Sequence, residues 1–462
     1  MPSLHSRREF LRRSFAAAVT PAVATRQAHA PIVVVGAGLA GLRAATLLRQ
    51  GGRQVVVLEA RERSGGRVLT LRAPFDDGLV GEAGPIRIAG AHRAVLRAVK
   101  DYRLTLVPFE SANGAPLDPP AATSELRPEE RGLSSRALLE RYAGPLADKL
   151  AEPAATDASY AAWHEYDRLT WPEWLVQRGA SREAVRLMTL GGDSSSLSAL
   201  YLLRQFAMLR SSRQLFKIAG GMDRLPQAMA AALGDVVRYQ SPVVRISRAA
   251  GSLSIEHESG GRLERTTADH VVITVPLTTL RQIEFRPRLS AAKEKAIAAP
   301  PYYPGVRILL QSRERFWNRA GLNGSARTAR AEIWDAAYDR QGPALSSSKG
   351  PSRGLLGATA SGASFGATTD AQSLARGVDL VADAFPGIRS AFEKGVIHQW
   401  AQDRWSQGAF VAFAPGQMTA LLPEIARPED RVHFAGEHTS SWMGWMEGAL
   451  ESGERAAREI LG

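Results

Sequence analysis

The sequence contains no cysteine, so the protein forms no disulfide and has neither a thiolate metal site nor a cysteine nucleophile. Its histidines and acidic residues show no spacing typical of a metal site. It also lacks a nucleic-acid-binding motif, a patch of interleaved basic and aromatic residues, and any visible internal repeat. We therefore expect no metal and no nucleic-acid partner.

What is present is the composition of a globular protein, with 45% apolar and 23% charged residues in a chain of 462. A chain of this length is expected to form several compact units. The net charge is +12, from 58 basic and 46 acidic residues that are scattered along the chain. A basic surface can attract anionic partners, but the scatter favours an ordinary solvated surface.

The first 30 residues have the pattern of an export signal. Ser6-Arg7-Arg8-Glu9-Phe10-Leu11-Arg12 has the form of a twin-arginine motif, an apolar stretch follows at residues 15–24, and Ala28-His29-Ala30 offers a cleavage site. The apolar stretch is too short to span a bilayer. The pattern predicts a signal peptide at residues 1–30, the twin-arginine translocase as a partner, and a periplasmic or secreted protein. The alternative is a basic extension without such a role.

Residues 31–59 predict a β-α-β unit that binds a dinucleotide. The apolar run at 32–35 is typical of a buried strand, Gly36-Ala37-Gly38-Leu39-Ala40-Gly41 opens a helix, and a second strand at 54–58 ends at Glu59. In this context Gly36 permits a tight turn, Gly38 lets the main chain approach a pyrophosphate, and Gly41 lets the helix pack closely. An ordinary glycine turn is the alternative interpretation. The cofactor contacts expected in this unit are Gly36, Gly38, Leu39, Ala40, Gly41, Glu59, Ala60 and Arg61.

Further motifs decide which dinucleotide is expected. Arg63-Ser64-Gly65-Gly66-Arg67-Val68 follows Glu59 directly, and Gly436-Glu437-His438-Thr439 and residues 444–449 lie near the end of the chain. In this order, and together with residues 221–226 and 400–416, they resemble the flavin amine oxidase family over nearly the whole chain after residue 30. The resemblance implies FAD. It adds Gly66, Arg67, Gly84, Pro85, Ile86, Arg87, Val243, Trp400, Gly436, Glu437, Gly444, Trp445 and Met446 to the expected cofactor contacts.

The resemblance also implies a fold and a division into domains. We expect an α/β protein with a glutathione-reductase-like, Rossmann-type FAD-binding domain, a mixed-sheet substrate domain and a helical insertion. The FAD-binding domain is expected at residues 31–105, 213–280 and 396–462. The helical insertion is expected at 106–212, where Ala, Leu, Arg and Trp recur at helical spacing, and the substrate-binding domain at 281–395.

Substrate residues follow from the same resemblance. Gly84-Pro85-Ile86-Arg87-Ile88 and the following His92-Arg93 resemble a segment of the L-amino acid oxidases in which the Arg pairs with the substrate carboxylate. The alternative for Arg87 is a structural salt bridge. Phe410 and Trp445, with Gly444 beside them, match the aromatic cage that aligns the amine in front of the flavin.

Two positions depart from common family patterns. Ala409 stands where covalent members carry the flavin-linking cysteine, so FAD is expected to be noncovalent. Arg307, in the strand at 305–309, stands where the family has a lysine that holds a water beside the flavin. An arginine cannot release a proton near neutral pH, which puts fast reaction with oxygen in doubt. The expected catalytic residues are Arg307, Phe410 and Trp445.

The expected reaction is oxidative deamination of an L-amino acid. A hydride equivalent passes from the α-carbon of the neutral amine to flavin N5, and the imine hydrolyses to a 2-oxo acid and ammonia. Oxygen or a periplasmic electron carrier is expected to accept the electrons. The sequence does not decide whether the protein forms a homodimer. The alternatives are a monoamine or polyamine oxidase, an amine dehydrogenase, and an FAD-binding protein with little turnover.

Overall fold

The structure is a computed structural model that describes residues 30–109, 122–151, 160–189, 194–210, 214–319, 321–337, 353–360, 365 and 370–462. The predicted export signal lies outside these residues except for Ala30, so it stays a prediction from the sequence. In the part of the chain that the structure describes, no helix combines the length and apolar character needed to cross a membrane.

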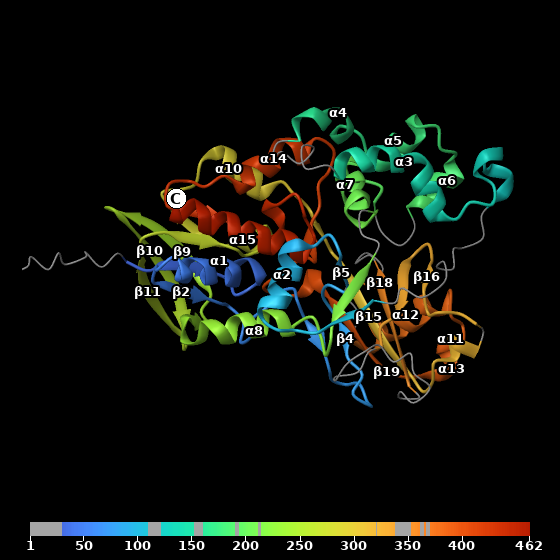
Figure 1. Cartoon of the computed structure of the whole chain (residues 1–462), viewed down its shortest axis with the longest axis horizontal. Coiled ribbons are helices and arrows are strands. Elements are labelled where there is room, and N and C mark those ends of the chain that lie inside the picture. The colour runs from blue at the N-terminus through green and yellow to red at the C-terminus, as the bar shows by residue number, and fades with distance from the viewer. Residues whose placement is uncertain are drawn as a thin grey trace, which may run out of the picture.

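A five-stranded parallel sheet forms one end of the molecule (Figure 1). Its strands run in the order β21 (Val432–Phe434), β12 (Val271–Ile273), β1 (Ile32–Val35), β2 (Val55–Leu58) and β8 (Val237–Arg238). The core strands are apolar along their whole length because helices cover the sheet. Three separate stretches of sequence therefore build one sheet, with α1 (Leu39–Gln50) beside α15 (Met446–Leu461), and α8 (Arg224–Leu233) also packed against α1.

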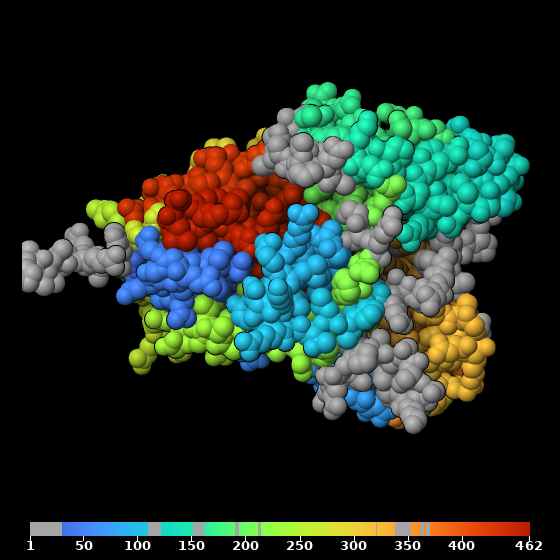
Figure 2. Space-filling view, in the orientation of Figure 1, coloured from blue at the N-terminus to red at the C-terminus, as the bar shows by residue number. Residues whose placement is uncertain are grey.

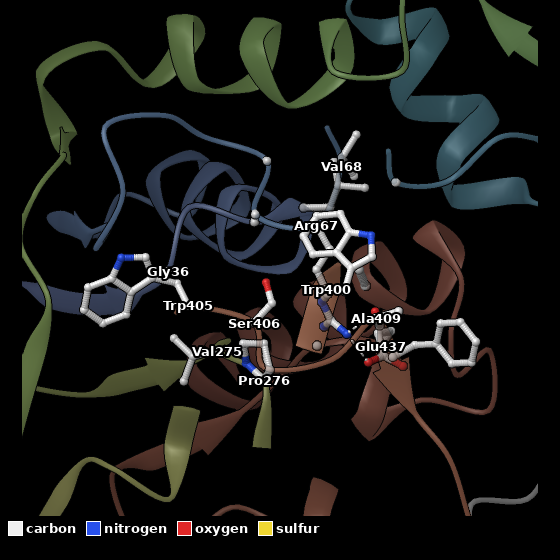
Figure 3. Close-up of a pocket in the computed structure, with 18 of the residues that line it drawn as sticks. Gly36, Arg67, Val68, Val275, Pro276, Trp400, Trp405, Ser406, Ala409 and Glu437 are labelled. Atoms are coloured by element: carbon white, nitrogen blue, oxygen red, sulfur yellow. Dashed lines mark hydrogen bonds and ion pairs between the residues drawn. The ribbon is translucent and has the colours of Figure 1, made fainter. Parts of the chain in front are cut away.

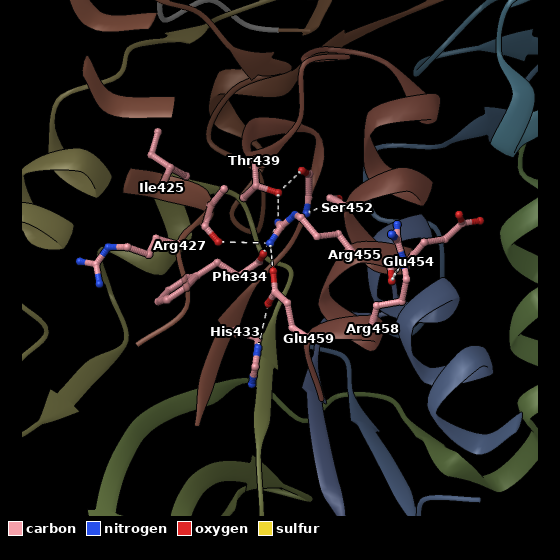
Figure 4. Close-up of polar contacts among 12 residues, drawn as sticks. Ile425, Arg427, His433, Phe434, Thr439, Ser452, Glu454, Arg455, Arg458 and Glu459 are labelled. Carbon is pink, nitrogen blue, oxygen red and sulfur yellow. Dashed lines mark hydrogen bonds and ion pairs between the residues drawn. The ribbon is translucent and has the colours of Figure 1, made fainter. Parts of the chain in front are cut away.

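Polar contacts fix α15 against the end of β21 (Figure 4). Arg455 donates from Nη2 to the carbonyl of Phe434 at 2.7 Å and to Oγ1 of Thr439 at 3.0 Å. One turn further on, Glu459 accepts from His433 Nδ1 at 2.9 Å. These contacts anchor the C-terminal half of α15, and its N-terminus consequently has a fixed direction.

A helical lobe lies at the other end of the molecule (Figures 1 and 2). Its helices are α3 (Ser135–Ala151), α4 (His164–Asp167), α5 (Trp171–Gln177), α6 (Arg182–Met188) and α7 (Ala199–Arg210). Thr170 caps α5, since its side chain accepts from the N–H of Glu173 while the Glu173 carboxylate accepts from the N–H of Thr170. Trp171 and Trp174 are buried and stacked with ring centroids 5.2 Å apart, so they are core residues.

A second five-stranded sheet lies across from this lobe at the same end (Figure 1). Its order is β16 (Ala326–Arg327), β17 (Ala331–Asp335), β18 (Gly354–Ala360), β15 (Val306–Ser312) and β19 (Phe392–Gln399). Every neighbouring pair is antiparallel, so the prediction of a mixed sheet in the substrate domain is wrong. Alternation along a strand reveals a buried face but not the direction of pairing, which depends on the connections; the three residues between β16 and β17 permit only an antiparallel turn. The helices α11 (Phe316–Arg319), α12 (Asp370–Ala382) and α13 (Ile388–Ala391) belong to the same region.

Smaller elements join these parts. A four-stranded sheet has the order β11 (Arg262–Ala268), β10 (Ser252–Ser259), β9 (Val243–Ala249), β13 (Glu284–Arg286), and a three-stranded sheet the order β5 (Ile88–Ala89), β7 (Leu215–Ile218), β6 (Leu106–Pro108). Two-stranded pairs are β3 (Thr70–Leu71) with β4 (Gly81–Glu82), and β14 (Tyr302–Tyr303) with β20 (Phe410–Val411). The remaining α-helices with described bounds are α2 (Arg93–Asp101), α9 (Leu277–Leu280), α10 (Ala291–Ala298) and α14 (Gln417–Ala426).

Two of the expected domain limits cut through sheets of the structure. The limit at residue 395 falls inside β19. The limit at residue 280 separates β13 from β9, although these two strands pair with each other.

Candidate active site

A cavity of about 610 Å³ runs from the carboxyl edge of the parallel sheet to the second five-stranded sheet and to α7. Ligands in α/β proteins bind outside the carboxyl ends of parallel strands, and the residues after β1, β2, β12 and β21 all line this cavity. All the predicted site residues line it except Gly41: Gly36, Gly38, Leu39, Ala40, Glu59, Ala60, Arg61, Gly66, Arg67, Gly84, Pro85, Ile86, Arg87, Val243, Arg307, Trp400, Phe410, Gly436, Glu437, Gly444, Trp445 and Met446.

The first glycine turn has the geometry of a phosphate cradle. Gly36 has a φ of 105°, which favours glycine. A Cβ at Gly38 would meet no atom within 4 Å, whereas a Cβ at Gly41 would lie 2.0 Å from the carbonyl oxygen of Gly36. Gly38 therefore leaves room beside the cavity for a ligand, and Gly41 serves the close packing of α1 on the turn after β1.

Glu59 is held rigidly at the end of β2. Its carboxylate accepts from the main-chain N–H of Ala37 at 2.7 Å and from that of Arg61 at 2.8 Å. Burial raises the pKa of Glu59, although these two hydrogen bonds oppose the rise. The Arg61 side chain instead bonds to Asp403 and Ser406. Glu59 can accept further hydrogen bonds from hydroxyls of a ribose, whereas the side chain and the main-chain N–H of Arg61 are both bonded within the protein.

Arg67 and Glu437 form an ion pair between the second glycine motif and the C-terminal motif (Figure 3). Arg67 Nη1 lies 2.7 Å from Glu437 Oε1 and also donates to the carbonyl of Ala409 at 3.0 Å. Burial disfavours the charge on Arg67, but Glu437 outweighs this effect and raises the pKa of the guanidinium. Glu437 accepts further from the N–H of Gly444 at 2.7 Å. The pair therefore connects the second glycine motif, the segment at Ala409 and the C-terminal motif. Both oxygens of the Glu437 carboxylate accept hydrogen bonds from the protein itself.

Two helix N-termini meet at the cavity. α1 begins after Gly38 and α15 after Trp445, and neither has a side-chain cap. Residues Leu39 and Ala40 of α1 and Met446 and Ala449 of α15 line the cavity. Uncapped first-turn N–H groups and the positive end of each helix dipole favour negative charge. The site fits a dinucleotide with a pyrophosphate at α1 and a cofactor ring, negative when reduced, at α15.

Aromatic side chains wall the part of the cavity beyond this cradle. Phe410 stacks on Tyr303 with ring centroids 5.1 Å apart and an interplanar angle of 17°, because β14 and β20 pair these two residues. Trp445 donates from Nε1 to Gln205 Oε1 of α7 at 2.8 Å, and buried His92 packs edge-on against it at 5.1 Å. Burial first, and then Arg87, lower the pKa of His92 to about 4, so this ring is neutral near pH 7. Tyr303 thus supports Phe410, and Gln205 and His92 support Trp445.

Arg307 is fastened to the segment that carries Arg87. Its guanidinium donates to the carbonyl of Gly84 at 2.8 Å, to that of Ala83 at 3.4 Å, and to Thr359 Oγ1, and it lies over the ring of Trp334 at 4.9 Å. Burial lowers the pKa of Arg307 to about 10, with Glu332 opposing the fall, so the group stays charged at neutral pH. Its contacts hold the second sheet against residues 83–84.

Arg87 reaches the cavity with a partner that the sequence analysis did not identify. Its Nη1 atom lies 3.5 Å from Glu332 Oε1, and both side chains remain partly exposed, at 21% and 35%. Burial disfavours charge on Glu332, but Arg87, Arg327 and Arg307 together outweigh it and lower the pKa of Glu332. Arg87 thus forms a salt bridge, which was the alternative to a substrate contact, and its side chain also lines the cavity.

Sequence reasoning missed several lining residues, among them Gln205, Tyr303, Glu332, Thr359, Trp405 and Ser406. In Figure 3 the indole rings of Trp405 and Trp400 lie on opposite sides of Ser406. A signal for Glu332 was present, because a carboxylate between the apolar residues Ala331 and Ile333 of a strand requires a polar environment. Among the described residues, no group of three or more potential ligands could hold a metal ion.

The fold and the cavity define a dinucleotide-binding protein whose cofactor cradle continues into an aromatic pocket with an arginine at its end. A model of the family described as flavin containing amine oxidoreductase matches residues 39–461. The Bacillus subtilis (strain 168) protein YobN, which bears a provisional L-amino-acid oxidase name, is 31% identical over 93% of this chain and 94% of its own length. The L-amino-acid oxidase of Gloydius halys is 28% identical over 93% of this chain and 88% of its own.

Solved structures share the fold. Putrescine oxidase bound to putrescine superposes with a TM-score of 0.78 at 21% identity, and cyclohexylamine oxidase from Brevibacterium oxydans IH-35A with 0.75 at 23%. Each covers 94% of this chain and 99% of the other. The chain belongs to the flavin containing amine oxidoreductase family. It is an FAD-dependent amine oxidoreductase, which confirms the predicted cofactor and class of enzyme.

Proposed function

We propose that this protein oxidises the α-amine of an L-amino acid, and that Arg87 binds the α-carboxylate. The observation that carries the proposal is one continuous cavity, in which the guanidinium of Arg87 lies with Phe410, Tyr303 and Trp445. A guanidinium pairs with a carboxylate through two parallel hydrogen bonds. The L-amino-acid oxidase names among the relatives support this choice over an amine without a carboxylate.

The chemistry divides between cofactor and chain. FAD, when bound, accepts a hydride equivalent from the carbon that bears the neutral amine, and the resulting imine hydrolyses to a carbonyl compound and ammonia. Arg87 orients the substrate from its carboxylate end, and Phe410 and Trp445 align the amine between apolar walls. Gln205 and His92 keep Trp445 in place. Arg307 positions the Gly84–Arg87 segment from the second sheet.

The test is an anaerobic mixing experiment with the purified, FAD-loaded protein. L-amino acids, their D-enantiomers and the matching amines are added separately, and the flavin absorbance near 450 nm is followed. Bleaching by L-amino acids, with little or none by the D-enantiomers, is the expected result. Bleaching only by simple amines would favour a monoamine oxidase, and no bleaching at all would favour an FAD-binding protein with little turnover.

FAD is proposed to be bound without a covalent link. Ala409 lines the cavity and carries no group that can attack the flavin, and the chain has no cysteine. Precipitation of the holoprotein with acid is expected to release all of the yellow colour into the supernatant. Flavin that stays with the washed pellet would contradict this prediction.

Arg307 is proposed to slow reaction with oxygen. Three acceptors hold its guanidinium close to the protein, and it cannot pass a proton to a nearby water. Arg307→Lys shortens the head group and is expected to leave room for a water, so reoxidation by oxygen should accelerate while anaerobic reduction changes only a few-fold. Stopped-flow measurement of the two half-reactions separates these effects. If the native enzyme reoxidises as fast as the lysine variant, it is an ordinary oxidase and a separate electron carrier is not needed.

A further inference from the structure

We propose that Glu332 is the resident counter-ion of Arg87 and sets the preference of the cavity between amino acids and amines that lack a carboxylate. The inference rests on the proposed function and adds a residue that determines specificity within the same site. Its basis is the 3.5 Å contact between Arg87 Nη1 and Glu332 Oε1 inside the cavity that both residues line.

The position of Glu332 follows from strand register rather than from a flexible loop. Glu332 of β17 is paired with Thr359 of β18, and Thr359 with Arg307 of β15, so the three side chains stand in one row across the sheet. All three line the cavity. Neighbours in such a row lie close enough for their charges to interact. The sheet therefore presents Glu332 to the cavity at a fixed place.

The charges at this end of the cavity do not cancel. Arg87 and Arg307 are cationic and Glu332 is anionic, which leaves one positive charge in excess. A substrate carboxylate is attracted by this excess, but it has to compete with Glu332 for Arg87. An amine without a carboxylate leaves the Arg87–Glu332 pair intact, so the partly exposed Arg87 keeps its counter-ion. Glu332 thus weakens binding of amino acids and permits binding of simple amines.

The decisive variant is Glu332→Gln, which keeps the size of the side chain and removes its charge. For L-leucine, kcat/KM is expected to rise roughly tenfold, the effect of one weakly screened charge a few ångströms away. For 3-methylbutylamine, which is leucine without its carboxylate, kcat/KM is expected to fall several-fold, because the cavity then repels a cationic amine more strongly. A merely structural role for Glu332 predicts losses of the same sign for both, and that result would overturn the proposal.

Ligand binding gives a second readout that needs no turnover. 4-Methylpentanoate has the carboxylate and side chain of leucine but no amine, and its binding can be followed through the flavin spectrum. Glu332→Gln should bind it more tightly, and this gain should vanish when Arg87→Ala is also present. Glu264→Gln, which removes an exposed carboxylate from β11, is the matched control and should bind it as the native protein does. If the native enzyme turns over neither substrate but the binding gain occurs, deamination fails and the counter-ion role stands; if the gain is absent, the counter-ion role fails.

Discussion

Arg87→Ala is expected to raise KM for an L-amino acid by roughly 30- to 150-fold, which corresponds to about 2–3 kcal/mol for the loss of charge-assisted hydrogen bonds to a carboxylate. Binding of the matching decarboxylated amine should not be weakened, since this amine makes no contact with the guanidinium and the Glu332 carboxylate released from Arg87 attracts its cationic form. The contrast arises because Arg87 lines the cavity with a partly exposed side chain, so a substrate carboxylate can reach its guanidinium in competition with Glu332.

Steady-state kinetics with an amino acid and its decarboxylated amine measure this contrast directly. Arg87→Lys is the matched variant, because it retains the charge but not the planar fork that pairs with both carboxylate oxygens. We expect it to recover part of the affinity and not all of it. Equal losses for the amino acid and the amine in Arg87→Ala would show that Arg87 supports the cavity and does not bind the carboxylate.

The glycine turn after β1 offers a pair of variants with different expected failures. A Cβ at Gly41 would lie 2.0 Å from the Gly36 carbonyl oxygen and force α1 away from the turn. Gly41→Ala is therefore expected to destabilise the apoprotein by about 1–3 kcal/mol or more, the usual cost of overpacking. A Cβ at Gly38 would meet no protein atom within 4 Å, but it would occupy open space beside the cavity, where we expect the cofactor to approach the main chain. Gly38→Ala should leave the apoprotein as stable as the native one and weaken FAD binding by roughly tenfold or more.

Thermal unfolding of the apoproteins and titration with FAD distinguish the two variants. The expected result is lowered thermal stability for Gly41→Ala and an unchanged unfolding curve with weakened FAD binding for Gly38→Ala. If Gly38→Ala bound FAD with native affinity, this would show that the pyrophosphate of FAD does not lie against the main chain at Gly38. If Gly41→Ala unfolded like the native apoprotein, the close packing of α1 on β1 would not matter for stability.

Local sequence patterns predicted the cofactor half of the cavity well. The elements at 32–58 were expected from buried apolar runs and glycine spacing, and they form as β1, α1 and β2. Glu59 and Arg67 were expected at the cavity and line it. The substrate half was predicted less completely, because its residues come from strands and helices far apart in the chain. Glu332 meets Arg87 across 245 residues, and Gln205 meets Trp445 across 240.

The sequence by itself determined the β-α-β unit and the requirement for glycine at the turn, because these features depend on residues within a few turns or strands of one another. The expectation of FAD came instead from the resemblance of motifs along the chain, in their order, to the flavin amine oxidase family. Only the tertiary structure decided that the second sheet is antiparallel throughout, that Arg307 is fastened to residues 83–84, and that Arg87 has a counter-ion. Strand register places Glu332, Thr359 and Arg307 in one row, and register is a property of how distant strands pair, which no short stretch of sequence specifies.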